Sequence, residues 1–187
     1  MQPSIIQLLD TRYLGIKMCP QPADKIGDQD VESFDFNGVS IGERISITPL
    51  ADNGEQLPEN SESLFYLVTL RISIENKEGK IAPYDIDINL AGRFKISHTV
   101  QKEKQKDMVL VNGCSILYST IRELVVTLSA RSVYGILTLP TVNFQDHIQK
   151  NTGPPQDSQP TKKKKTVKKA APAKKAVAKK KASKKKK

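Results

Sequence analysis

The sequence has no tryptophan, two cysteines and few aromatic residues in a chain of 187 residues. Cys19 and Cys114 are too few for a disulfide framework and form no C-x-x-C pair for zinc or redox chemistry, so we expect a reducing compartment. Asp10 interrupts the short apolar run near the N-terminus and no basic stretch precedes it, which argues against a signal peptide. No window approaches the roughly 18 apolar residues of a membrane-spanning helix. These absences predict a soluble cytoplasmic protein.

Catalytic motifs are equally scarce. His98 and His147 are the two histidines, and they lie far apart in the sequence. A metal site or a nucleophile–base pair would need several such groups to converge. No glycine-rich phosphate-binding loop is present. We therefore predict no enzyme activity, no metal and no cofactor, and we interpret Cys114 as a small buried residue rather than as a thiol with a lowered pKa.

The positive charge of the chain comes from its C-terminal end. Residues 162–187 contain 15 lysines and no acid, while the whole chain has a formal net charge of +10, so residues 1–161 carry −5. We predict a folded domain over residues 1–150 and a disordered basic tail over residues 151–187, because the tail composition supports no core. Lysine binds phosphates as a point charge, which predicts polyanion binding without base readout; the alternative is a tail that only improves solubility. The candidate polyanion-binding residues are Lys162, Lys163, Lys164, Lys165, Lys168, Lys169, Lys174, Lys175, Lys184 and Lys185.

Alternating apolar and polar residues predict a sheet with one buried face. The alternation is clearest over residues 64–75 and 83–97, which we expect to form an antiparallel hairpin. Residues 33–50 alternate too, but glycines interrupt them, so we expect a long strand with a bulge or a break. Residues 5–18 are a weaker candidate for a fourth strand. The polar residues 51–63 and 98–108 are expected to be connections.

A helical spacing follows the hairpin. Its apolar residues recur on one face of a helix of about 18 residues, whose start could be capped by Asn112 or Ser115. The β-branched residues near 125 leave a strand as the competing interpretation. Gly135 and Pro140 end the helix, so residues 135–140 should form an extended apolar connection before a short second helix. The apolar helical residues are Leu117, Ile121, Leu124, Val125 and Leu128.

In this order, three segments resemble the SecB family of export chaperones. They are the hairpin at residues 65–97, the long helix with its Ser-Arg turn at 115–132, and the connection GILTLPTVNF at 135–144. The resemblance implies an α+β fold, with a four-stranded antiparallel sheet followed by a long helix and a short second helix. It also implies a homotetramer built as a dimer of dimers. Family members are ATP-independent holdases that bind unfolded polypeptides, for the translocation motor ATPase or, in SecB-like relatives, for protection of an antitoxin.

The resemblance also implies site residues. We expect client polypeptides to contact apolar side chains in the regions that line the family's groove, although each of these side chains could equally belong to the core. The client-binding candidates are Phe34, Phe36, Tyr134, Ile136, Leu137, Leu139 and Phe144. The oligomer-interface candidates are Leu117, Ile121, Leu124 and Leu128.

Two departures from the family affect the expected partners. Gly15, Lys17 and Cys19 stand where motor-docking members carry acids, which weighs against motor docking and favours another client such as an antitoxin. The lysine tail is the second departure. It leaves open contact with nucleic acid or the ribosome, and an alternative function as a nucleic-acid-associated protein with an oligomerising SecB-like core.

Overall fold

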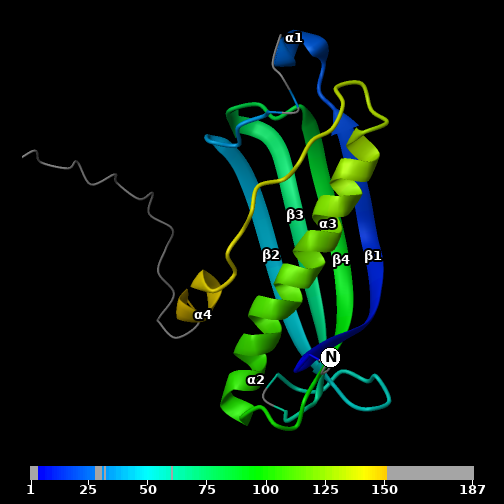
Figure 1. Cartoon of the computed structure of the whole chain (residues 1–187), viewed down its shortest axis with the longest axis vertical. Coiled ribbons are helices and arrows are strands. Elements are labelled where there is room, and N and C mark those ends of the chain that lie inside the picture. The colour runs from blue at the N-terminus through cyan, green and yellow to red at the C-terminus, as the bar shows by residue number, and fades with distance from the viewer. Residues whose placement is uncertain (1–3, 28–30, 32, 60, 151–187) are drawn as a thin grey trace, which may run out of the picture. The chain divides into compact units, whose positions relative to one another are not determined.

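The computed structural model describes residues 4–27, 31, 33–59 and 61–150, and the predicted basic tail lies outside these residues. One antiparallel sheet has the strand order β1-β4-β3-β2, and a long helix crosses one of its faces (Figure 1). The predicted α+β class is confirmed, including the hairpin of β3 and β4 and the long helix after it. The strands are β1 (Ile6–Pro20), β2 (Val39–Leu50), β3 (Phe65–Gly79) and β4 (Tyr84–Ile96). The helices are α1 (Ala23–Ile26), α2 (Lys102–Met108), the π-helical turn η1 (Val109–Gly113), α3 (Cys114–Ser129) and α4 (Asp146–Lys150).

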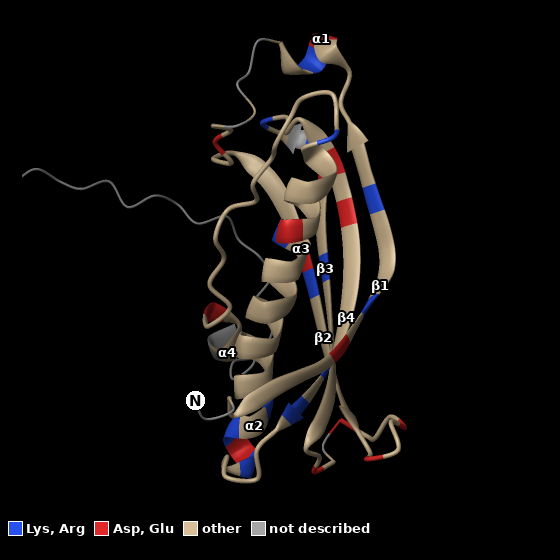
Figure 2. Ribbon diagram, turned by 45° about the vertical axis from the view of Figure 1, so that its right-hand side comes forward, with Lys and Arg blue, Asp and Glu red and all other residues tan. Residues whose placement is uncertain are grey.

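The alternation of side chains gives the sheet two unlike faces. On the face toward the helix, which we call the inner face, Leu70 lies opposite Leu90, and both are fully buried. On the other, outer face, the Arg71 guanidinium donates two hydrogen bonds of 2.7 Å to the Asp87 carboxylate. Figure 2 shows charged residues along β1, β3 and β4, whereas most of α3 is uncharged. The sheet therefore separates an apolar core from a charged surface.

Strand β1 breaks the simple alternation twice. Its pairing with β4 shifts register after Leu8 and again after Tyr13. Each shift inserts one extra residue, as a β-bulge does. Between the two bulges Tyr13 lies opposite Leu90 on the inner face, while Arg12 lies opposite Ala91 on the outer face. The bulges thus decide which β1 side chains reach the charged surface.

The long helix begins ten residues before the predicted cap at Asn112, so the prediction of a connection over residues 98–108 is wrong for most of its length. Residues 102–108 are polar because α2 is mostly exposed, with Gln105 buried and donating to the Val100 carbonyl at 3.1 Å. The turn η1 joins α2 to α3 without a break. Neither Asn112 nor Ser115 acts as a cap; each donates to a carbonyl one turn earlier in the helix.

The helical segment Lys102–Ser129 has 28 residues and is apolar enough, by length and composition alone, to cross a membrane. The expectation that no such segment exists is wrong by this criterion. The criterion is weak evidence for a span, because the core helix of a globular domain also meets it. In its most apolar stretch 44% is buried inside the structure.

The buried face of α3 differs in part from the predicted one. Leu117, Ile121 and Val125 are fully buried against the sheet, as the spacing predicts. Leu128 is exposed and Leu124 is half-buried, so neither belongs to the fully buried face of α3. Tyr118 and Ser129 are buried in addition, and both use their hydroxyl groups in the site described next.

Candidate functional site

The segment after α3, residues 133–144, lies over the inner face between α3 and β2 (Figure 1). We call it the strap. Leu137, Leu139 and Phe144 of the strap are buried in the same apolar core as the sheet and α3. Ile136, by contrast, is 41% exposed. The strap therefore closes part of the core and presents other apolar side chains to solvent.

The first part of the strap is held by Tyr84 of β4. The Tyr84 hydroxyl accepts a hydrogen bond from the Tyr134 backbone N–H at 3.2 Å and donates one to the Gly135 carbonyl at 3.0 Å. The two tyrosine rings also pack edge to face, with centroids 5.9 Å apart. Gly135 has a φ of +80°, a conformation that favours glycine because it has no Cβ. The chain thus turns sharply at the end of α3 with its polar groups satisfied.

Two hydroxyl groups of α3 hold the rest of the strap. Ser129 Oγ accepts a hydrogen bond from the buried Leu137 N–H at 2.9 Å. The Tyr118 hydroxyl donates to the Pro140 carbonyl at 2.6 Å, and burial is the main cause that raises the pKa of Tyr118, to about 12. The Tyr118 ring also packs edge to face on Phe144 at 5.8 Å. Side chains of α3 therefore hold the strap through hydrogen bonds to the backbone of the strap.

The end of the strap reaches β2 through α4. His147 Nε2 lies 2.8 Å from Glu43 Oε1. Glu43 occupies a position on β2 between Ile41 and Ile45, which pack against the core, so it is the polar member of an otherwise apolar row. Sequence reasoning took His147 for an ordinary surface residue, and the glutamate partner could not be identified because it is about 100 residues away in the chain.

A cleft of about 500 Å³ opens beside β2. In the part of the chain that the structure describes, β3 is the one strand that pairs with β2, and the other edge of β2 is occupied only at its end, where Leu50 bridges to Gln56 of the following loop. Apolar side chains on one wall come from β2, and Leu110 of η1 lies on the other. The lining residues are Glu43, Arg44, Ile45, Ser46, Ile47, Glu59, Lys106, Leu110 and His147. The cleft thus combines an unpaired strand edge with apolar and charged side chains.

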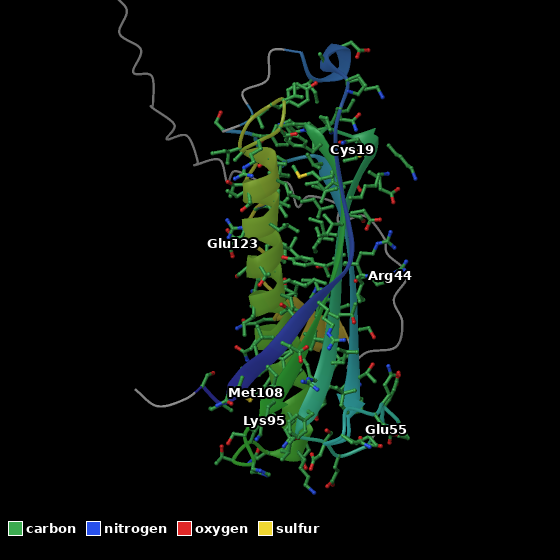
Figure 3. The ribbon with its side chains drawn as sticks, turned by 90° about the vertical axis from the view of Figure 1, so that its right-hand side faces the viewer. Cys19, Arg44, Glu55, Lys95, Met108 and Glu123 are labelled. Atoms are coloured by element: carbon green, nitrogen blue, oxygen red, sulfur yellow. The ribbon has the colours of Figure 1, made fainter. Side chains whose placement is uncertain are left out.

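A second apolar surface lies along β1. Leu8, Tyr13 and Ile16 point to the inner face but stay exposed, because the long helix packs mainly on β3 and β4. The pKa of Tyr13 is raised, first by partial burial and then by the carboxylate of Glu123. In Figure 3, Glu123 lies on the side of α3 that faces away from the sheet, whereas Arg44 lies on the sheet itself. We call Leu8, Tyr13 and Ile16 the β1 strip.

The family model for "Preprotein translocase subunit SecB" matches residues 50–152, more than half of the chain. This chain belongs to the SecB family. SecB proteins are chaperones of protein export and not enzymes, so the predictions of the family and of a non-enzymatic protein are confirmed. The match covers the β3–β4 hairpin, the long helix, the strap and α4.

Protein-export relatives extend the likeness to SecB. "Protein-export protein SecB" of Ehrlichia canis (strain Jake) is 27% identical over 124 residues, covering 60% of this chain and 70% of the relative. Its counterpart in Ehrlichia ruminantium (strain Gardel) is 31% identical over 108 residues, covering 54% of this chain and 62% of the relative. The Mycobacterium tuberculosis Rv1957 SecB-like chaperone, in complex with a ChAD peptide from the Rv1956 HigA1 antitoxin, aligns with a TM-score of 0.43 and 19% identity, covering 74% of this chain and 88% of that one.

The structure places the predicted client-binding residues of this SecB-family chain in two groups. Phe34 and Phe36 pack edge to face at 5.1 Å in the loop before β2, at the same end of the sheet as the beginning of the strap (Figure 1). They are half-buried, as is Tyr134, and Ile136 is exposed. The remaining three, Leu137, Leu139 and Phe144, are sealed in the core of a single chain. The four accessible residues can contact a partner directly, whereas the buried three would require the strap to move.

The predicted oligomer-interface residues divide in a similar way. Leu117 and Ile121 have no exposed surface, so they support the fold of one chain. Leu128 is exposed, Leu124 is half-buried, and both remain candidates. Sequence reasoning missed the β1 strip and the exposed Val133, which is 80% accessible. Among the described residues no group of three His, Cys, Asp or Glu side chains is arranged to hold a metal ion.

Proposed function

We propose that this SecB-family protein is an ATP-independent holdase that binds unfolded polypeptides along the free edge of β2. The observation that carries the proposal is the cleft lined by Ile45, Ile47 and Leu110 beside the unpaired edge of β2. An extended client can add a strand to such an edge, gaining backbone hydrogen bonds that do not depend on its sequence. This is the recognition mode that a chaperone with many clients needs.

Apolar contacts supply the remaining affinity. Burial of one apolar client side chain is worth about 1.5–3 kcal/mol, and several weak contacts along one chain reinforce one another. Phe34, Phe36, Tyr134 and Ile136 at the far end of the sheet would extend the surface beyond the cleft. Release of the strap would add Leu137, Leu139 and Phe144. The predicted client-binding residues would then act in two stages, the four accessible ones before the strap is released and the three buried ones after it.

Self-association through the β1 strip fits the same proposal. Exposed apolar side chains on a free strand edge are a natural contact for a second copy, with Leu124 and Leu128 of α3 on the same side of the sheet. The assembly expected from the family is a homotetramer, a dimer of dimers. We place the protein in the cytoplasm, with a preprotein or an antitoxin as client. Contact of the tail lysines with polyanions remains a separate proposal about residues beyond 150.

An aggregation assay tests the function. The full-length protein should slow the aggregation of a chemically denatured model protein without added ATP. Ile45→Asp should weaken this protection, with a loss of affinity for an unfolded client of about tenfold, because one apolar contact is lost and a charge faces the cleft. Ile45→Thr keeps a β-branched residue at the position and should give a smaller loss in the same direction.

Ile5→Asp provides the control, since Ile5 is exposed and apolar but does not line the cleft and lies outside the proposed client surface. It should protect the client as well as the unmodified protein does. Equal losses for Ile45→Asp and Ile5→Asp, with both variants folded by circular dichroism, would exclude the cleft as the client site. Ile16→Lys addresses the β1 strip separately and should lower the mass measured by analytical ultracentrifugation.

A further inference from the structure

We propose that the outer face of the sheet holds a second binding site, which accepts a short acidic polypeptide segment carrying aliphatic side chains. The site lies on the face opposite the strap and the helices. It is a pocket of about 320 Å³ between β1, β4, β3 and the loop after β2. Its lining residues are Asp10, Arg12, Leu14, Leu50, Gly54, Gln56, Leu67, Thr69, Ala91 and Arg93. This inference is independent of the cleft beside β2.

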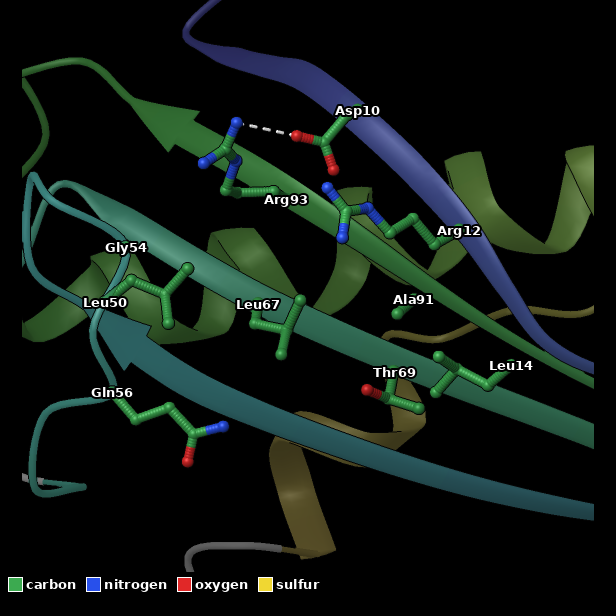
Figure 4. A pocket seen from close by; sticks show the side chains of 10 residues that line it. All are labelled: Asp10, Arg12, Leu14, Leu50, Gly54, Gln56, Leu67, Thr69, Ala91 and Arg93. Atoms are coloured by element: carbon green, nitrogen blue, oxygen red, sulfur yellow. Dashed lines mark ion pairs between the residues drawn. The ribbon is translucent and has the colours of Figure 1, made fainter.

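The pocket exists because of the two bulges in β1. They reverse the alternation between Leu8 and Gly15, which puts Asp10 and Arg12 on the outer face. The second bulge leaves Leu14 as the extra residue at the edge of the pocket, where it is 60% exposed. Figure 4 shows Arg12 and Arg93 along one side of the pocket and Gln56 of the loop on the other. Leu67 and Thr69 lie between them.

The charges of the pocket are unbalanced toward the positive. Arg93 Nη2 forms an ion pair with Asp10 Oδ2 at 2.7 Å. Arg12 forms no ion pair within the ranges that the structure describes, although its guanidinium lies beside this pair (Figure 4). Two guanidinium groups thus face one carboxylate. A carboxylate from a partner completes the balance and can accept a bidentate pair of hydrogen bonds from Arg12.

The rest of the pocket fits a polypeptide. Leu50 and Leu67 provide an aliphatic floor beside the arginines, and Leu14 adds an apolar edge. The Gln56 carboxamide and the Thr69 hydroxyl offer both donors and acceptors, which a peptide backbone can use. The pocket is also part of an open sheet surface, where an extended segment can lie across several strands. A carboxylate next to a leucine or valine in one chain matches this arrangement.

Fluorescence polarisation with a labelled peptide of alternating glutamate and leucine, added to the full-length protein, tests the site. Arg12→Glu should weaken binding by about tenfold or more, as expected for loss of a charge-assisted contact. Arg131→Glu changes the net charge equally at an exposed position after α3, outside the pocket, and should have little effect. Asp10→Asn should strengthen binding, because it frees Arg93, whereas Asp24→Asn on α1 should not.

Each outcome decides the matter. No binding of the peptide, or equal losses for Arg12→Glu and Arg131→Glu, would overturn the proposal, since the lysine tail would then account for any attraction. Binding that survives replacement of the peptide glutamates by glutamine would also overturn it. Stronger competition by a medium-chain fatty acid than by the unlabelled peptide would assign the pocket to another ligand. Arg12→Glu should leave client protection unchanged, which separates this site from the cleft beside β2.

Discussion

Replacement of Ser129 by alanine would remove the hydrogen bond that holds the centre of the strap. Ser129 is the last residue of α3 and has no exposed surface. Its Oγ accepts from the Leu137 N–H at 2.9 Å and donates to the Val126 carbonyl at 3.1 Å. The substitution deletes the acceptor and leaves the Leu137 N–H buried without a partner. The Val126 carbonyl keeps its hydrogen bond from the Ala130 N–H, at 3.0 Å.

The expected loss follows from these contacts. A buried donor without an acceptor costs about 1–3 kcal/mol. Alanine has a higher helix propensity than serine, which offsets about 0.5 kcal/mol. The net effect of Ser129→Ala should be a decrease of about 0.5–2.5 kcal/mol in the free energy of unfolding. Locally, the amide of Leu137 should exchange with solvent faster, because the strap is held less firmly.

Urea denaturation and amide hydrogen exchange measure the two effects. Ser119→Ala is the matched control, because Ser119 lies on the same helix, is exposed and donates within the helix to the Ser115 carbonyl. It should be neutral or slightly stabilising. If Ser129→Ala unfolds at the same urea concentration as Ser119→Ala, with unchanged exchange of the Leu137 amide, the hydrogen bond does not hold the strap.

Three further predictions concern the sheet and the cysteines. Gly92→Ala should cost about 1–3 kcal/mol by denaturation, because the added methyl would lie 2.7 Å from Leu117 Cδ2; an unchanged midpoint would contradict the packing. The pKa of Asp87 is lowered chiefly by its hydrogen bonds from the neighbouring guanidinium, so its contribution is present above the unfolded-state pKa and lost as pH falls through the folded-state value. Asp87→Asn should therefore flatten the acid side of the stability profile. Burial raises the pKa of the Cys114 thiol to about 12, so iodoacetamide at mildly alkaline pH should modify the exposed Cys19 alone, by mass spectrometry.

The hairpin and the other strands differ in how far the sequence predicts them. The hairpin of β3 and β4 was predictable because its register is uninterrupted from Phe65 to Ile74, so buried residues alternate with half-buried ones along this part of β3. Strand β1 was a weak prediction because its two bulges break that alternation. Because of the same bulges, the sequence pattern does not show that Asp10 and Arg12 lie together on the outer face. The alternation of apolar and polar residues in a sequence does not reveal an inserted residue, because the position of the insertion depends on how the strand pairs with its neighbour.

The helix and the strap show a different limit. Residues 102–108 look like a loop because an exposed helix needs few apolar residues, and the π-helical turn after them shifts the buried stripe. In the strap, Leu137 and Leu139 alternate with exposed neighbours, which identifies an extended segment but not what covers it. The choice between core and client surface depends on Ser129 and Tyr118, whose hydroxyl groups hold the strap. Such side-chain contacts leave no periodic signal in the sequence.

The free edges of the sheet bear on whether molecules of this protein can polymerise. A sheet open on both sides is able to polymerise if the last strand of one molecule pairs with the first strand of the next, as in a filament. Here the centre of β2 carries the charges of Glu43 and Arg44, and the backbone of β1 is kinked twice. Both features disfavour regular head-to-tail stacking. The edge of β2 can thus remain open to the proposed unfolded clients while the protein resists forming fibres of its own.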